Sequence, residues 1–366
     1  MRKLWIVWCG LLISAATGVY AQSSVIDDSS RIDISDNETG KLVRVSKITS
    51  TDGEAPSLPQ SSDEKENKLS PEELCRKADA GDVNAQLDAG YMYLYGVDGE
   101  KVDYGKALHY YTLAAQQKNA AALNNLGSLY FNGLGTPVNY KKAIQYFEEA
   151  TQLGSNDAAV NLAIIYMGSN PETKTQVDFQ KIYDLLKQAE TTNKTAKFLV
   201  GYSYYQGFLV KQDYKKAFLL IKAVADAQYD EAQYVLADFY INGFGAPKSY
   251  ARAVEYLEKA AAQGNSAAIM KLAGILEEGE IYPKDTKRAY VLYNTAATLG
   301  EDSAAGKRDE IEKSLSLNDL LAAQQEAEKY VSTPSDLTAF IRKTFGNSLK
   351  IYVDINMDAD FDIIAD

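Results

Sequence analysis

Small and apolar residues recur along this chain with a period of about 36 residues. An alanine marks each period, and the intervals between successive marker alanines are 37, 36, 38, 36, 36 and 36 residues. The marker alanines are Ala85, Ala122, Ala158, Ala196, Ala232, Ala268 and Ala304. Such a period indicates stacked supersecondary units, because a single unit of this size cannot bury its apolar face alone.

Signals for helix ends keep the same period. A glycine, which adopts the left-handed conformation that ends helices, follows each of the first six markers by ten or eleven residues. A side chain that can cap the next helix comes six to ten residues later. The glycines are Gly96, Gly133, Gly168, Gly207, Gly243 and Gly279, and the caps are Asp103, Asn139, Asp178, Asp213, Ser249 and Asp285. Each period therefore predicts two helices of about twelve residues joined by a loop.

Small residues also close the second helix of each period, where neighbouring helices approach closely. They are Ala114, Ala150, Ala189, Val224, Ala260 and Ala296. A basic column stands early in the same helices, at Lys106, Lys142, Lys181, Lys216, Arg252 and Arg288. We therefore expect an all-α fold, a right-handed α-solenoid of about six two-helix repeats of 36–38 residues each, with a concave and a convex face.

The stretch from Ala122 to Gly135, with the sequence ALNNLGSLYFNGLG, resembles the first helix and loop of the Sel1-like repeat (SLR) family, a relative of the tetratricopeptide repeats. The resemblance covers about residues 83–315. It implies a helical-repeat fold and says little about function. The third repeat departs most, with a long loop from Ser169 to Val177 and with Ile182 where its neighbours have alanine.

The beginning of the chain has the order of a secretory signal peptide. Arg2 and Lys3 precede an apolar run, and small residues lead to Ala21. We expect residues 1–21 to be cleaved and the protein to be exported, to the periplasm or beyond the cell. No later stretch reaches the length of about 18 apolar residues that a membrane helix needs.

Composition and periodicity divide the rest of the chain into four further parts. Residues 22–70 are polar and rich in Ser, Asp and Glu, which predicts a flexible leader. The solenoid is expected over 71–315, and capping helices over 316–345. Residues 346–366 alternate apolar and acidic positions, which predicts a strand-like acidic tail. Its aspartates are spaced like calcium ligands, but Ala359 and Ala365 replace the turn glycine and the bidentate glutamate, so calcium is disfavoured.

Charge and residue counts exclude several functional classes. The formal net charge is -12 and becomes -14 when Arg2 and Lys3 are lost, which disfavours nucleic acids and anionic lipids as partners. His109 is the only histidine of the sequence, and no phosphate loop is present, so the sequence predicts no catalytic site, metal or cofactor. Cys75 is left without a disulfide partner and is expected to be a packing residue, with a reactive thiol as the alternative.

In related repeats the first helix of each unit lines the concave face. Positions two, three, six, nine and ten after each marker are therefore candidate contacts for a protein partner. They include Asp88, Tyr91, Asn124, Asn125, Ser128, Asn132, Asn161, Tyr202, Tyr205, Gln206, Asp238 and Asn242. Amides and tyrosines suit recognition of a peptide backbone, since they supply donors, acceptors and flat apolar area. Some tyrosines could instead fill helix interfaces.

Two functions fit these features. The first is a periplasmic or secreted scaffold that binds a protein partner through the solenoid surface. The alternative is an immunity or inhibitor protein that blocks a toxic effector enzyme, which the acidic balance would suit. The sequence leaves the choice between them and the identity of the partner open.

Overall fold

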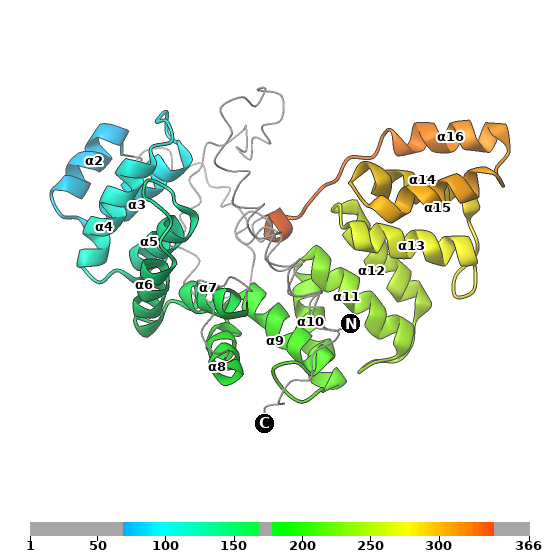
Figure 1. The fold of residues 1–366 in the computed structure, drawn as a ribbon, viewed down its shortest axis with the longest axis horizontal. Coiled ribbons are helices and arrows are strands. Elements are labelled where there is room, and N and C mark those ends of the chain that lie inside the picture. Colours follow the sequence, from blue (N-terminus) through cyan, green and yellow to red (C-terminus); the bar gives the residue numbers. More distant parts are fainter. Residues whose placement is uncertain (1–68, 168–177, 340–366) are drawn as a thin grey trace, which may run out of the picture. The chain divides into compact units, whose positions relative to one another are not determined.

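The computed structural model describes residues 69–167 and 178–339, whose regular structure consists of the α-helices α2 to α16 (Figure 1). The chain divides into two compact units, unit 1 up to Asn193 and unit 2 from Lys194. The predicted signal peptide, most of the leader, Gly168 with the loop of repeat three, and the acidic tail lie outside the described residues. No helix of the described ranges is long and apolar enough to cross a membrane.

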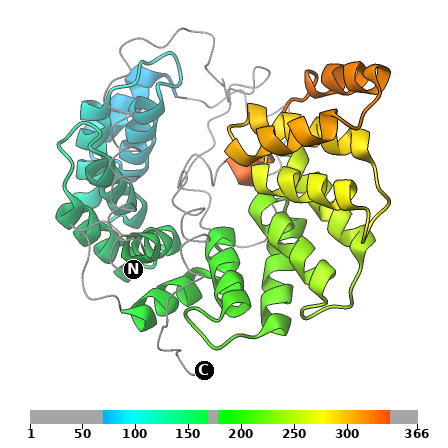
Figure 2. The same cartoon turned by 45° about the vertical axis from the view of Figure 1, so that its right-hand side comes forward.

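Unit 1 is a stack of helical hairpins. Its helices are α2 (Pro71–Asp79), α3 (Val83–Tyr95), α4 (Tyr104–Gln116), α5 (Ala120–Asn132), α6 (Tyr140–Gln152), α7 (Asn156–Met167) and α8 (Phe179–Ala189). The hairpins are α3–α4, α5–α6 and α7–α8, and the second helix of one packs on the first helix of the next (Figures 1 and 2). Helix α2 covers the open side of α3.

Unit 2 repeats this arrangement and adds two helices at its end. Its helices are α9 (Lys194–Gln206), α10 (Tyr214–Asp226), α11 (Asp230–Asn242), α12 (Tyr250–Ala262), α13 (Ser266–Glu278), α14 (Thr286–Thr298), α15 (Asp302–Glu312) and α16 (Leu317–Ala327). The hairpins are α9–α10, α11–α12 and α13–α14, and both α15 and α16 pack on α14. Together the units contain the six predicted hairpins, which confirms the all-α solenoid of helical repeats.

The predicted helix ends are confirmed throughout the described residues. Each of the six predicted caps accepts a hydrogen bond from the backbone amide three residues later, as Asp103 does from Lys106 at 2.9 Å. A cap of this kind stabilises a helix by about 1 kcal/mol. At the other end of the first helix, Gly133 and Gly243 have φ values of +69° and +76°, a conformation that side chains other than glycine rarely adopt.

The basic column has a role that the sequence did not reveal. In five hairpins the cation lies over a tyrosine ring of the preceding helix, at 4.3 to 5.5 Å from the ring centroid. The pairs are Lys106 with Tyr93, Lys142 with Tyr130, Lys181 with Tyr166, Lys216 with Tyr204 and Arg252 with Tyr240. In the sixth hairpin the tyrosine is replaced by Leu276, and Arg288 binds Glu258 instead, at 2.7 Å. These cation–π contacts help fasten the two helices of each hairpin together.

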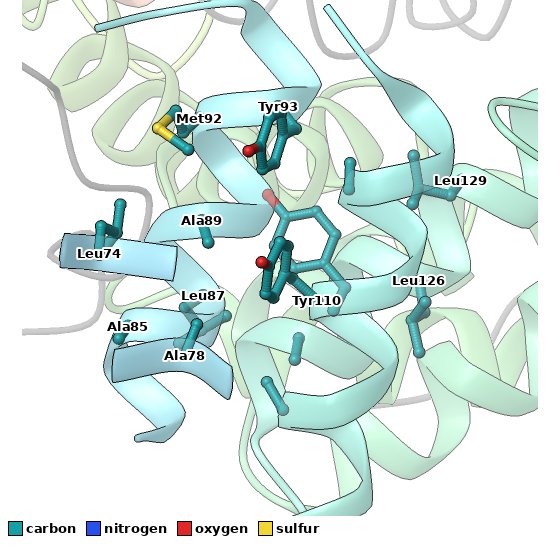
Figure 3. Packing of buried hydrophobic residues seen from close by; sticks show 14 residues of the cluster. Leu74, Ala78, Ala85, Leu87, Ala89, Met92, Tyr93, Tyr110, Leu126 and Leu129 are labelled. Atoms are coloured by element: carbon teal, nitrogen blue, oxygen red, sulfur yellow. The ribbon is translucent and has the colours of Figure 1, made fainter. Parts of the chain in front are cut away.

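The core of unit 1 shows how small residues permit close packing (Figure 3). Ala78, Ala85 and Ala89 bring α2 and α3 together, while Tyr93 stacks on Tyr110 with ring centroids 5.9 Å apart. Cys75 is half-buried against this cluster, and its thiol lies 3.5 Å from the hydroxyl of Tyr93. The surroundings of Cys75 are therefore those of a packing residue, as expected.

In unit 2 the chain turns back after α16 and binds to α11 and α12. The hydroxyl of Tyr330 donates to the carbonyl of Ala261 at 2.6 Å, and the amide of Thr333 donates to the carbonyl of Ala262 at 2.8 Å. A helical turn then begins at residue 336. We call residues 330–339 the return segment.

The return segment supplies a cap that the repeat itself lacks. Residue Tyr229 occupies the cap position of α11, and its side chain makes no capping hydrogen bond. The amide of Asp230 donates instead to the hydroxyl of Thr338 at 3.1 Å, and Thr338 is fully buried. A residue 108 positions further along the chain thus accepts from the first amide of α11, whereas Asp82, Asn119 and Asn265 cap other first helices by accepting from an amide two or three positions later.

Replacement of Thr338 by valine is expected to lower the free energy of unfolding by about 1–2 kcal/mol, because the amide of Asp230 loses its partner in a buried place. Thr338→Ser keeps the hydroxyl and should cost less. Urea denaturation of both variants measures the difference. Equal midpoints for valine and serine would contradict the capping role.

Candidate functional site

The predicted contact residues all lie on the first helices of hairpins, as the period required, but they fall in two separate sets. Helices α3, α5 and α7 of unit 1 carry Asp88, Tyr91, Asn124, Asn125, Ser128, Asn132 and Asn161. Helices α9 and α11 of unit 2 carry Tyr202, Tyr205, Gln206, Asp238 and Asn242. Each set therefore forms a surface of its own unit.

In unit 1 the polar side chains of neighbouring repeats meet. The side-chain amide of Asn161 on α7 donates to the side-chain oxygen of Asn124 on α5 at 2.8 Å, across 37 residues of sequence. Asn161 stands three residues after its marker alanine and Asn124 two after its own, so neighbouring positions of successive repeats lie side by side, as a stacked geometry predicts. We call Asn124, Asn125, Ser128, Asn132 and Asn161 the amide surface.

Two members of the amide surface use their donors within their own helix. The hydroxyl of Ser128 donates to the carbonyl of Asn124 at 3.2 Å, and the side chain of Asn132 donates to the carbonyl of Ser128 at 2.9 Å. Asn125 and Asn161 have no such bond to their own helix among the described residues. Asn161 already donates its amide to Asn124, so it is as a hydrogen-bond acceptor that it can bind a partner.

On α3, Tyr91 and Asp88 continue the polar side of unit 1. The ring of Tyr91 packs on Tyr95 with centroids 4.6 Å apart. Burial, followed by the nearby Tyr95 and Asp98, raises the pKa of Tyr91 above its ordinary value. Its hydroxyl therefore stays protonated at neutral pH and remains a hydrogen-bond donor.

The unit 2 set is dominated by aromatic rings. Tyr205, at the end of α9, is half-buried and lies 4.9 Å from Phe239, 6.2 Å from Tyr214 and 6.4 Å from Phe244, centroid to centroid. Tyr214 and Phe244 are themselves stacked with centroids 4.2 Å apart and planes 5° from parallel. We call Tyr205, Gln206, Tyr214, Asp238, Asn242 and Phe244 the aromatic surface.

The aromatic surface stands on a rigid base. Phe239 is fully buried beneath Tyr205 and also contacts Phe218, with centroids 6.0 Å apart. Burial, followed by the carboxylate of Asp238, raises the pKa of Tyr205, so its hydroxyl stays a neutral donor. A half-exposed ring held from below is the kind of side chain that contributes strongly to binding energy at protein interfaces.

Tyr202 lies differently from the other predicted contacts. Only 4% of its surface is exposed, its ring packs on Phe198 with centroids 5.9 Å apart, and its hydroxyl accepts a hydrogen bond from Gln206 at 2.8 Å. Tyr202 therefore orients Gln206 and fills the helix interface, which is the alternative use expected of these tyrosines.

Charged groups border the aromatic surface. Asp238 forms an ion pair with Lys271 on α13, whose ammonium group also lies 5.4 Å from the ring centroid of Tyr234. Lys271 stands three residues after its marker alanine, as Asp88, Asn125 and Asn161 do, so the same spacing could have found it. Tyr214 and Phe244 were also missed, because their approach to Tyr205 depends on three separate segments.

The chemistry of these surfaces is that of recognition. Neither surface places a nucleophile beside a base, and no group of three potential metal ligands occurs in the described residues. His109 is exposed on α4 beside the ring of Tyr110, with centroids 5.2 Å apart. What both surfaces offer is amide and hydroxyl hydrogen bonding next to flat apolar area.

Comparison with protein families identifies the repeat unit. A family model described as Sel1 repeat matches residues 83–119, 120–155, 195–229, 230–265 and 266–301. The matches cover every hairpin except α7–α8, the one whose sequence departs most from the period. No curated protein sequence matches the chain at a significant level.

Solved structures with the same repeat are similar in fold. A protective antigen present in uropathogenic Escherichia coli strains, displaying an SLR fold, is 23% identical with a TM-score of 0.66, over 80% of this chain and 60% of the antigen. This chain thus spans about 60% of that relative's length. A Sel1 repeat protein from Oxalobacter formigenes is 24% identical with a TM-score of 0.54, over 63% of this chain and 97% of that one. Identities this low show the fold alone.

Proposed function

Because the chain belongs to the Sel1 repeat family, a family of protein-interaction scaffolds, we propose that it is a scaffold that binds a protein partner through the aromatic surface of unit 2. The amide surface of unit 1 is a second candidate surface, which we treat separately. The observation that carries the proposal is the cluster of Tyr205, Tyr214 and Phe244, which is half-buried and held in place by a buried phenylalanine.

Several properties support this choice over a catalytic function. Tyrosine and amide side chains are favoured where a partner is bound without chemical change, since they bury area and form hydrogen bonds at little entropic cost. Rings that are already ordered lose little freedom on binding. The immunity or inhibitor alternative would use the same surfaces, and identification of the partner as a toxic enzyme or as a structural component separates the two.

The experiment is crosslinked capture of the partner from cells that express the chain, followed by measurement of the affinity of the purified pair. Tyr205→Ala combined with Tyr214→Ala is expected to weaken binding about tenfold or more, the scale of a loss of about 1.4 kcal/mol. The matched control is Tyr104→Ala with Tyr250→Ala, because these tyrosines are exposed at 39% and 37% and lie outside both surfaces. Circular dichroism checks that both variants keep their helix content.

Undiminished affinity of the Tyr205/Tyr214 variant would remove the aromatic surface from the proposal. An equal loss in the control variant would also contradict it, since the effect would then not be specific to the surface. Asn125→Ala with Asn161→Ala tests the amide surface in the same assay, and a loss there alone would place the contact on unit 1.

We also propose that the protein is exported, which rests on the charged start and apolar run of residues 1–21. Intact mass of the protein recovered from a bacterial envelope fraction is expected to correspond to a chain that begins at Gln22. A chain that keeps Met1 and stays inside the cell would contradict export while leaving the binding surfaces unaffected.

A further inference from the structure

Two pairs of glutamines occupy equivalent places in the two units. In unit 2, Gln263 donates to the side-chain oxygen of Gln233 at 2.9 Å and to the carbonyl of Gln228 at 3.0 Å. In unit 1, Gln117 donates to the side-chain oxygen of Gln86 at 2.9 Å and to the carbonyl of Gly81 at 3.1 Å.

The inner glutamine of each pair is held in the same way. Gln86 donates to the carbonyl of Ala78 at 3.0 Å, and Gln233 donates to the carbonyl of Ala225 at 3.2 Å. The two pairs thus have the same three hydrogen bonds. Each pair lies at the junction of two repeats, where one helix ends and the next begins.

The pair in unit 2 is covered by the return segment. The side-chain oxygen of Gln263 accepts from the hydroxyl of Thr338 at 2.7 Å and from the amide of Ser335 at 2.9 Å. Ser335 is also the cap of the helical turn that follows, since its hydroxyl accepts from the amide of Thr338 at 3.1 Å. Gln263 therefore binds the start of a helix that has hydroxyl groups at its cap, Ser335, and three residues later, at Thr338.

The pair in unit 1 is uncovered within the described residues. Gln117 is exposed, whereas Gln263 keeps only 6% of its surface accessible. No donor in the described ranges reaches the side-chain oxygen of Gln117, and no described acceptor receives the amide of Val83, which is the unit 1 counterpart of Asp230. In unit 2 the corresponding acceptor is the side-chain oxygen of Gln263 and the corresponding donor is the amide of Asp230, and the hydroxyl of Thr338 bonds both of them.

We propose that the Gln86–Gln117 pair is a second docking site, for the start of a helix in a partner protein that carries Ser or Thr at its cap and again three residues later. The cap residue's amide and the second hydroxyl donate to Gln117, and the second hydroxyl accepts from Val83. Asp82, which caps α3 by accepting from the amides of Asn84 and Ala85 at 2.9 and 3.0 Å, adds a negative charge beside the docked helix start.

A partner protein fits better than a second copy of this chain. A second copy would have to withdraw its own Ser335 and Thr338 from Gln263. The hydrogen bonds that it formed with Gln117 would then only replace the equal ones that it broke at Gln263. The intramolecular site also has the advantage of a high effective concentration. A separate protein carries no such cost, so it gains the full set of contacts.

The test uses the full chain and a synthetic peptide with the sequence of residues 331–345, observed through isotope-labelled glutamine side-chain amides by NMR. Gln117→Ala identifies the signal of Gln117. On titration we expect that signal to move with saturation, while the signal of Gln263 stays in place. A peptide with Thr338→Val is expected to bind about tenfold more weakly, the effect of losing roughly 1.4 kcal/mol.

Three outcomes would overturn the proposal. The signal of Gln117 does not move up to the solubility limit of the peptide, or it moves equally with the Thr338→Val peptide, or only Gln263 responds because the peptide displaces the return segment. Gln117 is exposed, so Gln117→Ala is expected to fold normally and to abolish binding of a fluorescent form of the peptide. Since the aromatic surface is untouched by these changes, its assay remains an independent result.

Discussion

Replacing Phe239 by alanine is expected to lower the free energy of unfolding by about 3–5 kcal/mol, the largest effect of any single change considered for this protein. Phe239 is fully buried, and its ring contacts those of Tyr205 on α9 and Phe218 on α10. Alanine would leave a cavity that rigid helices on both sides cannot close. Thermal unfolding followed by circular dichroism measures the loss.

The same change should weaken partner binding, because Tyr205 loses the ring on which it lies. Leu219→Ala is the control, since Leu219 is 68% exposed on α10 and its removal is expected to cost less than about 0.5 kcal/mol. A Phe239→Ala protein as stable as the Leu219→Ala protein would show that the aromatic surface has no packed base.

Replacing Gly127 by leucine is expected to cost about 3 kcal/mol, at the upper end of the overpacking range. A Cβ atom at Gly127 would stand 2.7 Å from two ring carbons of Phe147, which is almost fully buried and has no room to move away. Because repeat stability depends mainly on neighbouring units, the damage should reach α4 and α7 first. Hydrogen exchange is expected to show faster opening in these helices.

Gly306→Leu is the matched control, since Gly306 is also helical but a Cβ atom there would meet no atom within 4 Å. This variant should be neutral or stabilised by up to about 1 kcal/mol, because leucine favours the helix more than glycine does. Equal unfolding midpoints for the two leucine variants would show that the close approach of α5 and α6 is not required.

Local features were predictable from the chain alone because their causes act over a few residues. The cap of α6, Asn139, binds the amide of Lys142 three positions later, and the period of the alanines places each helix on its neighbour. Even the third repeat, whose sequence departs most from the period, forms its two helices, and Ile182 is fully buried in the place that alanine holds elsewhere. The predicted first-helix positions of the contact residues are confirmed for the same reason.

Contacts between residues that lie far apart in the sequence were decided by the tertiary structure. No pattern around Tyr229 shows that Thr338 caps its helix, because a contact across 108 residues depends on the path of the return segment. The spacing from the marker alanine likewise predicts both Tyr202 and Tyr205 as partner contacts. In the structure Tyr202 is buried against Phe198, whereas Tyr205 stays half-exposed among rings from α10 and α11. The sequence by itself determined the repeats and their boundaries, since these follow from backbone capping and periodic burial. The structure decided which side chains remain available to a partner, since exposure depends on every neighbour at once.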